Sequence, residues 1–257
     1  MQNLSEPFIR SEKKWLNFKL YLMKYFASFI LVFLISFVNA QKQQVNENLK
    51  KELDEILRLD QTYRRLFDNG ITAEKKSEIL KKLNIDEKDF EEKQWQLVVD
   101  IDSLNTRKIE KIISQYGYPG KSLVGEPTNR SAWYVIQHSN KIGKYLPIIK
   151  NAGKQKEIPF TLAAMMEDRF LMENNKEQIY GTQGTTERTI DKKGDEVYTS
   201  FIWPVKNPKT VNKLRKDVGF SDTVEDYAKD LFGKDFVYMP MTLKQALDLK
   251  KHSSRIH

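Results

Sequence analysis

The chain contains no cysteine among its 257 residues. This absence excludes a disulfide scaffold, a zinc ribbon, a thiol nucleophile and a lipid anchor on an N-terminal cysteine. Histidine is also scarce, with three residues, two of them close to the C-terminus. The mean hydropathy of −0.60 excludes a polytopic membrane protein. The length is enough for one medium-sized domain or two small ones.

Several signatures of catalysis and nucleotide binding are missing: G-x-x-x-x-G-K-[ST], G-x-G-x-x-G, G-x-S-x-G and H-E-x-x-H. We expect no cofactor and no metal, because no second histidine lies at ligand spacing. Basic residues outnumber acidic ones, 43 to 35, but the two kinds alternate on the N-terminal helices, as on solvated helix faces. No basic stripe interleaved with aromatic residues is present, so we expect no nucleic-acid partner.

An uncharged apolar run of thirteen residues extends from Phe26 to Val38. Lys24 precedes it and Val38-Asn39-Ala40 follows, which is the pattern of a secretory signal peptide cleaved after Ala40. A membrane-spanning helix needs about 20 apolar residues, so a retained anchor is the weaker alternative. We therefore expect a secreted or periplasmic protein without a stable membrane span after signal cleavage.

Residues 1–22 fit poorly in front of such a leader because they carry Glu6, Pro7 and Glu12. We expect translation to start at Met23, which makes 23–40 the signal peptide and 1–22 an N-terminal extension that is not translated. Residues 1–40 hold five basic and two acidic residues, so the net charge of +8 falls to +5 after processing.

The mature chain is expected to be mainly α (α+β), a compact helical domain with a small β-hairpin, preceded by a helical N-terminal region. Thr72 is expected to cap a helix, a further helix is expected to open near Asp86, and glycines 70 and 117 are expected to end helices. Helical periodicity predicts helices over residues 42–68, 72–83, 86–116, 128–139, 141–151, 159–174, 208–218, 222–232 and 241–251. Strand formers between 179 and 203 flank Asp191-Lys192-Lys193-Gly194-Asp195 and predict a hairpin with a charged tip. Residues 121–127 are expected to form a loop.

This organisation predicts three parts after the leader. Residues 41–95 form the helical N-terminal region, 96–235 the domain that contains the hairpin, and 236–257 a C-terminal helix with a basic tail.

The helix at 159–174 has apolar residues on all sides, which indicates a central position. Asp168 and Arg169 interrupt it, and charges at such positions must be paired or hydrogen-bonded. They form either a structural ion-pair network or a carboxylate and a guanidinium that line a cavity.

His138 is the only histidine outside the C-terminal tail and therefore the only candidate imidazole base. Trp133 and Gln137 share a face of the same helix. In the preceding helix, Asp102 and Asn105 lie three residues apart, and Asn105 interrupts a stripe of isoleucines. Each of these groups is a candidate for ligand binding or for a satisfied structural role.

Tyr180-Gly181-Thr182-Gln183 follows the central helix at the mouth of the predicted hairpin. Gly181 permits a tight turn or a close backbone approach. Tyr180 and Gln183 offer uncharged hydrogen-bonding groups that suit a sugar or a peptide backbone, and suit plain turn formation equally well.

The order of motifs resembles an uncharacterised bacterial domain family of unknown function that is often found behind signal peptides. These motifs are D-x-x-N (102–105), Y-G-Y-P (116–119), V-G-E (124–126), W-x-x-x-Q-H (133–138), D-R (168–169), Y-G-T-Q (180–183), W-P-V (203–205) and V-N-K-L-R-K-D-V-G-F (211–220). The resemblance covers about residues 97–233 and points to the candidate residues above, but it implies no activity. The chain departs from the family pattern at Ser139-Asn140 and at Lys206, where the family often has acidic residues.

Three hypotheses follow. The first is a binding or interaction domain whose polar pocket is built from Gln137, His138, Asp168, Arg169, Tyr180 and Gln183. The second is a hydrolase of cell-envelope glycan or peptide, in which Asp168 supports His138 as general base towards water and Arg169 steadies an oxyanion. The third is a buried polar network that only stabilises the fold. The sequence does not decide between them and does not indicate the oligomeric state.

Overall fold

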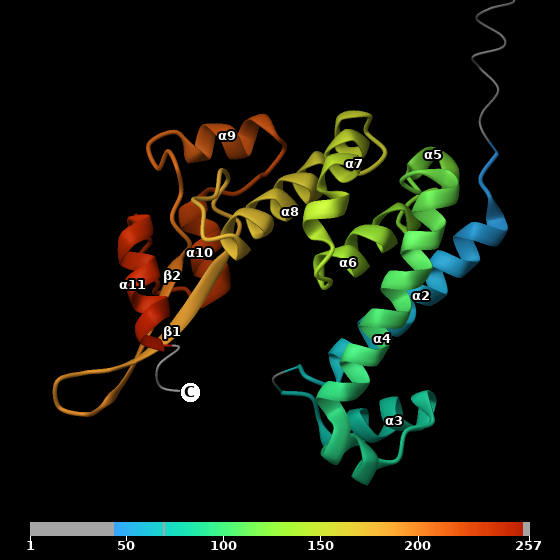
Figure 1. Cartoon of the computed structure of the whole chain (residues 1–257), viewed down its shortest axis with the longest axis horizontal. Coiled ribbons are helices and arrows are strands. Elements are labelled where there is room, and N and C mark those ends of the chain that lie inside the picture. Colours follow the sequence, from blue (N-terminus) through green and yellow to red (C-terminus); the bar gives the residue numbers. More distant parts are fainter. Residues whose placement is uncertain (1–43, 69, 254–257) are drawn as a thin grey trace, which may run out of the picture. The chain divides into compact units, whose positions relative to one another are not determined.

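The computed structural model describes residues 44–68 and 70–253. The predicted leader at 23–40 and the predicted start at Met23 lie outside the described residues. The described part of the chain contains ten α-helices, one 3-10 helix and one antiparallel hairpin (Figure 1). This confirms the mainly α class with a small β element. Within these ranges, no helix combines the length and the apolar character that crossing a bilayer requires.

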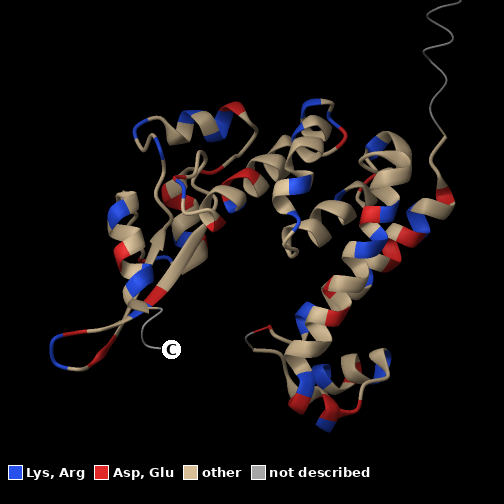
Figure 2. Ribbon diagram, in the orientation of Figure 1, with Lys and Arg blue, Asp and Glu red and all other residues tan. Residues whose placement is uncertain are grey.

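Three helices open the described chain, each with a side-chain cap at its N-terminus. They are α2 (Glu47–Arg65), α3 (Ala73–Leu83) and α4 (Glu87–Tyr116). Asn46, Thr72 and Asp86 accept hydrogen bonds from the first free backbone N–H groups of these helices, which confirms the predicted cap at Thr72. Gly117 ends α4 with a positive φ of 73°. Both signs of charge alternate along α2 and α4, as expected for solvated faces (Figure 2).

The middle of the chain is also helical. Its elements are α5 (Lys121–Val124), the 3-10 helix η1 (Thr128–Arg130), α6 (Ser131–Gln137), α7 (Ile142–Lys154) and α8 (Phe160–Glu173). The loop predicted over 121–127 is wrong in its first half, where α5 forms. The reason is a tertiary contact, because Glu157 accepts the free N–H groups of Lys121 and Ser122.

The C-terminal part contains the hairpin and three helices. These are β1 (Gly184–Ile190), β2 (Glu196–Ile202), α9 (Val211–Asp217), α10 (Val224–Phe232) and α11 (Leu243–Ser253). The register pairs Gly184 with Ile202 and Ile190 with Glu196, so the predicted charged tip is confirmed. Asp191 closes this tip by accepting the N–H groups of Lys193 and Asp195.

The main hydrophobic core lies where α2, α4 and α6 pack together and where α7 packs on α8. Leu53, Ile109 and Ile149 are completely buried in it. The helices α2 and α4 are antiparallel neighbours, because Arg64 near the end of α2 pairs with Asp102 in the middle of α4. Leu49 and Ile112 meet at the opposite end. The core therefore combines helices that are distant in sequence.

The helix α8 connects two apolar clusters, which explains why its apolar residues point in several directions. Met165 and Phe170 pack against the main core, and Met172 packs against a cluster formed by Phe201, Trp203 and other residues of the C-terminal part. The central position predicted for this helix follows from these contacts.

Candidate functional site

The polar residues singled out from the sequence fall into two groups with different surroundings. The first group surrounds Asp168, which is completely buried in α8. Its Oδ1 accepts the backbone N–H of Ile179 at 2.7 Å. Its Oδ2 accepts the backbone N–H and the hydroxyl of Thr182 at 3.1 and 3.0 Å, and the N–H of Tyr180 lies 3.1 Å from both oxygens. The carboxylate therefore fixes the loop that leads into the hairpin.

Arg215 of α9 holds the same loop from the other side. Its Nη1 donates to the Tyr180 carbonyl at 3.0 Å, and its Nη2 lies 2.7 Å from Asp222 Oδ2. The guanidinium is buried between the rings of Phe220 and Tyr227, 4.6 and 5.4 Å from their centroids. Planar contact with two rings together with an ion pair is a strong reason for arginine at this position.

The loop is also joined to the end of β2. Gln178 is buried and its amide binds both the N–H and the carbonyl of Gln183. The same side chain donates to the carbonyl of Trp203, and the backbone N–H of Gln178 donates to Pro204. The D-R, Y-G-T-Q, W-P-V and V-N-K-L-R-K-D-V-G-F motifs thus meet in one buried polar network, defined here as Asp168, Gln178, Tyr180, Thr182, Gln183 and Arg215.

The chain needs glycine at position 181 in this network. Gly181 has a φ of +68°, and a Cβ placed there would lie 2.7 Å from Cγ2 of Val224. Both the backbone conformation and the lack of space exclude a larger residue. At Gly181 the backbone therefore comes close to the start of α10, as the Y-G-T-Q motif allowed.

The Asp168 carboxylate has little hydrogen-bonding capacity left for a ligand. Burial raises the pKa of Asp168, and four donors on the loop oppose that effect by stabilising the carboxylate. Both oxygens are occupied by the loop, so neither is available to orient His138.

The second group surrounds a surface cleft of about 440 Å³, called here the α4 cleft. Five of its residues come from one face of α4 after Val99, and four come from the connection between α6 and α7. They are Val99, Asp102, Ser103, Thr106, Arg107, Glu110, His138, Ser139, Asn140 and Lys141. His138 and Asp102, which were both predicted as site residues, are brought together here.

A layer of polar side chains lies behind this cleft. Asp60 of α2 is buried and pairs with Arg64, which reaches Asp102 at 2.7 Å. Burial raises the pKa of Asp102, and the positive charge of Arg64 opposes this. Asn105 is completely buried, and its amide oxygen and nitrogen have no hydrogen-bond partner among the described residues. A buried amide without partners costs about 1–3 kcal/mol, so this layer holds unused bonding capacity.

His138 follows the last residue of α6 and is partly buried. Desolvation lowers its pKa to about 4, with a further decrease caused by the positive charges of Arg64 and Arg169. Asp60 opposes the effect. The imidazole is therefore neutral at pH 7, with one nitrogen able to donate and the other able to accept a hydrogen bond.

Several polar groups that line the α4 cleft are free to bind a ligand in place of water. Within the described ranges, the ring nitrogens of His138 and the hydroxyls of Ser103 and Thr106 have no hydrogen-bond partner. Arg107 and Lys141 form no ion pair there, although Lys141 weakly attracts Glu110. This unused capacity distinguishes the cleft from the buried polar network.

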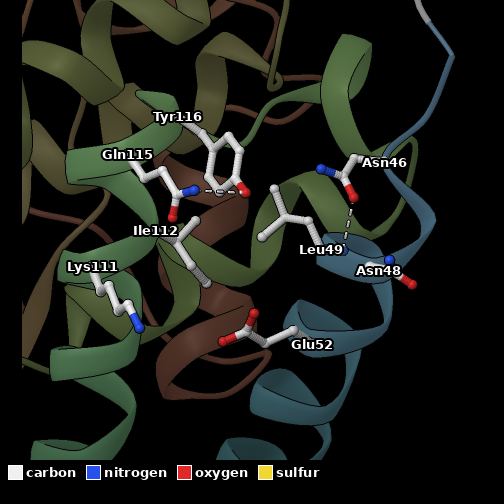
Figure 3. A pocket seen from close by; sticks show the side chains of 8 residues that line it. All are labelled: Asn46, Asn48, Leu49, Glu52, Lys111, Ile112, Gln115 and Tyr116. Carbon is white, nitrogen blue, oxygen red and sulfur yellow. Dashed lines mark hydrogen bonds between the residues drawn. The ribbon is translucent and has the colours of Figure 1, made fainter.

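A smaller cleft of about 300 Å³ lies between the start of α2 and the end of α4 (Figure 3). Leu49 and Ile112 form its apolar part, and polar side chains surround them. Part of its hydrogen-bonding capacity is already used, because Asn46 caps α2 and the Gln115 amide donates to the Tyr116 hydroxyl. We regard it as the weaker candidate.

The remaining predicted residues have individual positions. Trp133 is buried in the main core and donates to the Leu162 carbonyl at 2.7 Å. Gln137 is the last residue of α6 and is partly buried. Arg169 pairs with Glu173 at 3.3 Å and approaches His138 only electrostatically. The described residues contain no group of three or more His, Asp or Glu side chains that could hold a metal ion.

Sequence reasoning missed Asp60, Arg64, Gln178 and Arg215. Asp60 continues the apolar stripe Leu49-Leu53-Ile56 of α2, so its burial was detectable from helical spacing. Arg215 likewise follows Val211 on the inner face of α9. Gln178 carried no such signal, because it lies in a loop.

The fold and the motif residues define a mainly α domain of an uncharacterised family. Residues 71–236 match the family described as "Family of unknown function (DUF6624)", and the chain belongs to this family. The match includes α3, all of α4 and the α4 cleft, and it starts before residue 97, where the motif resemblance begins. Neither a curated protein nor a solved structure matches the chain.

Proposed function

We propose that the chain is a secreted or periplasmic binding module that holds a polar ligand in the α4 cleft. The observation that carries the proposal is the unsatisfied, neutral imidazole of His138 at the edge of this cleft. Ionisable groups with a shifted pKa in a cleft are common at functional sites. A group that stabilises the fold has its hydrogen bonds satisfied, as the Asp168 carboxylate does.

Export is supported by the sequence of residues 23–40, with its basic residue, apolar run and small residues before Gln41. For an exported protein, we take the ligand to be a component of the cell envelope, either a glycan or a peptide. Both offer neutral hydrogen-bonding groups to His138 and to the hydroxyls of Ser103 and Thr106.

Binding fits the site better than hydrolysis does. A general base works best when its pKa is close to the working pH, whereas His138 has a pKa of about 4 and is a weak base. The hydrolase hypothesis also requires Asp168 to support the imidazole, and the loop at 179–182 occupies that carboxylate.

The proposal is tested by thermal shift on the chain 41–257, with a panel of muropeptides, mono- and disaccharides, and short peptides. We expect at least one panel member to raise the melting temperature, because a ligand that binds only the folded state stabilises it. His138→Gln moves the donor and the acceptor of this side chain away from the positions of the ring nitrogens, so it should weaken binding of that ligand about tenfold through the loss of one well-placed hydrogen bond.

The matched control is His252→Gln, the same substitution at an exposed histidine of α11. It should leave binding unchanged. A panel without any stabilising ligand, or equal binding by the two variants, would refute the proposed site.

A further inference from the structure

An exposed apolar surface continues the α4 cleft towards the start of α4. The side chain of Trp95 is 69% exposed and that of Val99 is 56% exposed. Val99 also lines the cleft, so the apolar surface and the polar cleft are continuous. The Trp95 ring stacks on Phe67 with centroids 5.0 Å apart, which holds the indole in position although most of it is exposed.

The helical period places these residues on one face of α4. Trp95, Val99, Ser103 and Arg107 follow one another at intervals of four residues. Twelve residues separate the first from the last, so the surface is about 18 Å long at 1.5 Å per residue. An extended peptide rises about 3.3 Å per residue, and six residues reach from one end to the other.

The two ends of this surface differ in chemistry. The Trp95 end is apolar, whereas the other end carries Arg107 and Lys141, neither of which has an ion-pair partner in the described ranges. Glu110 at this end is already paired with Lys144 at 2.8 Å. Asp102, the other acidic residue of the lining, is paired with Arg64 at 2.7 Å. The two lining cations without an ion pair are therefore complementary to a carboxylate.

We infer that the ligand of the α4 cleft is an extended peptide segment of about six residues from a partner protein. Its apolar side chain packs on Trp95 and Val99, and a carboxylate at its other end lies between Arg107 and Lys141. The inference rests on the proposed function, because it names the class of ligand for the same site.

The groups between the two ends fit a peptide backbone. Ser103, Thr106 and His138 present donors and acceptors in the middle of the cleft, and a peptide offers one of each per residue. An uncharged glycan matches the hydroxyls equally well but leaves both cations without a partner. The charge and the length together favour the peptide.

A random hexapeptide library, displayed with a free C-terminal carboxylate, is selected against the chain 41–257. We expect the enriched sequences to combine an apolar residue at one end with a carboxylate at the other, either that of Asp or Glu or the C-terminal carboxylate itself. The strongest sequence is then synthesised and its affinity measured by calorimetry at two salt concentrations. Binding should weaken at higher salt, because exposed charges are screened.

Two pairs of variants locate the peptide on α4. Trp95→Ser should weaken peptide binding tenfold or more, as loss of an aromatic anchor does. Leu104→Ser is the control, because Leu104 is 39% exposed on another face of the same helix, and it should not weaken binding. Arg107→Gln should weaken peptide binding and reduce its salt dependence, whereas Lys108→Gln, which removes a cation that interacts with Glu55 of α2, should not. Val99→Ser serves as a second apolar variant if Trp95→Ser reduces folding.

The outcomes separate this inference from the proposed function. If no peptide is enriched while a sugar gives a shift that depends on His138, the inference is wrong and the proposed function stands. If peptides bind with equal affinity to wild type and to Trp95→Ser and Val99→Ser, the α4 surface is not their site and the inference is wrong.

Discussion

Asp168 and His138 were predicted as partners in one site, and their surroundings assign them different roles. Asp168 is buried and accepts hydrogen bonds from three successive parts of the loop at 179–182. His138 lines a cleft and has unused bonding capacity. The sequence identified both residues as polar groups in apolar surroundings. The sequence did not show which of the two side chains receives hydrogen bonds from the loop at 179–182, because that depends on contacts between segments distant in the chain.

Asp168→Asn should destabilise the protein by roughly 3 kcal/mol. An amide nitrogen in place of Oδ2 faces the backbone N–H of Thr182 and leaves that group buried without an acceptor, while the N–H of Tyr180 keeps only Oδ1. Urea denaturation measures the loss. Glu173→Gln on the exposed end of α8 is the control, with a change of about 0.5 kcal/mol or less. Equal effects of the two variants would show that the loop does not depend on Asp168.

The stability of the wild-type protein should fall in acid because of His138. Its folded pKa is about 4 and its ordinary pKa is 6.5, so the unfolded chain binds the extra proton between these values. The contribution is fully present above pH 6.5 and is lost as the pH falls towards 4. Between pH 7 and 4.5 the wild type should lose about 2 kcal/mol more than His138→Gln. Parallel pH profiles from urea denaturation of the two proteins would contradict the buried, neutral imidazole.

At the scale of elements, local signals predicted most of the fold. The caps Thr72 and Asp86 and the stop at Gly117 mark helix ends that depend on neighbouring residues only. The hairpin was detectable from strand formers on both sides of a charged turn. The short helix α5 was missed because its N–H groups are satisfied by Glu157, which is distant in sequence.

The turn at Gly181 gives a test at this scale. Gly181→Ala should cost about 3 kcal/mol, because the positive φ is strained for alanine and the added Cβ meets Val224 at 2.7 Å. Gly194→Ala at the hairpin tip also has a positive φ but meets nothing within 4 Å, so it should cost only about 1 kcal/mol. Thermal denaturation of both variants separates the cost of the contact with Val224 from the cost of the strained backbone. Equal losses would show that the loop does not press against α10.

At the scale of the whole molecule, α2 belongs to the core although it lies outside the family match. Leu53 of α2 is completely buried with residues of α4 and α6. The sequence predicted a helical N-terminal region over 41–95 but not how it packs, because an amphipathic helix does not indicate which partner covers its apolar face. For the same reason, the sequence did not predict how the candidate site residues divide into two groups, because each group is formed by segments far apart in the chain.

Leu53→Ala should therefore destabilise the whole protein by about 3 kcal/mol, within the usual range for a buried leucine. Chemical denaturation followed by both tryptophan fluorescence and far-UV circular dichroism checks this. The exposed neighbour Lys51→Ala is the control and should change little. If Leu53→Ala loosens only α2 and leaves the main transition unchanged, α2 is a separate arm and not part of the core.

The central claim is that the α4 cleft is the binding site. The most direct measurement is an NMR titration of the chain 41–257 with the ligand found by thermal shift or peptide selection. We predict that the backbone amide resonances that move belong to residues 95–110 and 138–141. Changes confined to residues 46–52 and 111–116, around the cleft of Figure 3, or to the loop at 178–183 would contradict the claim.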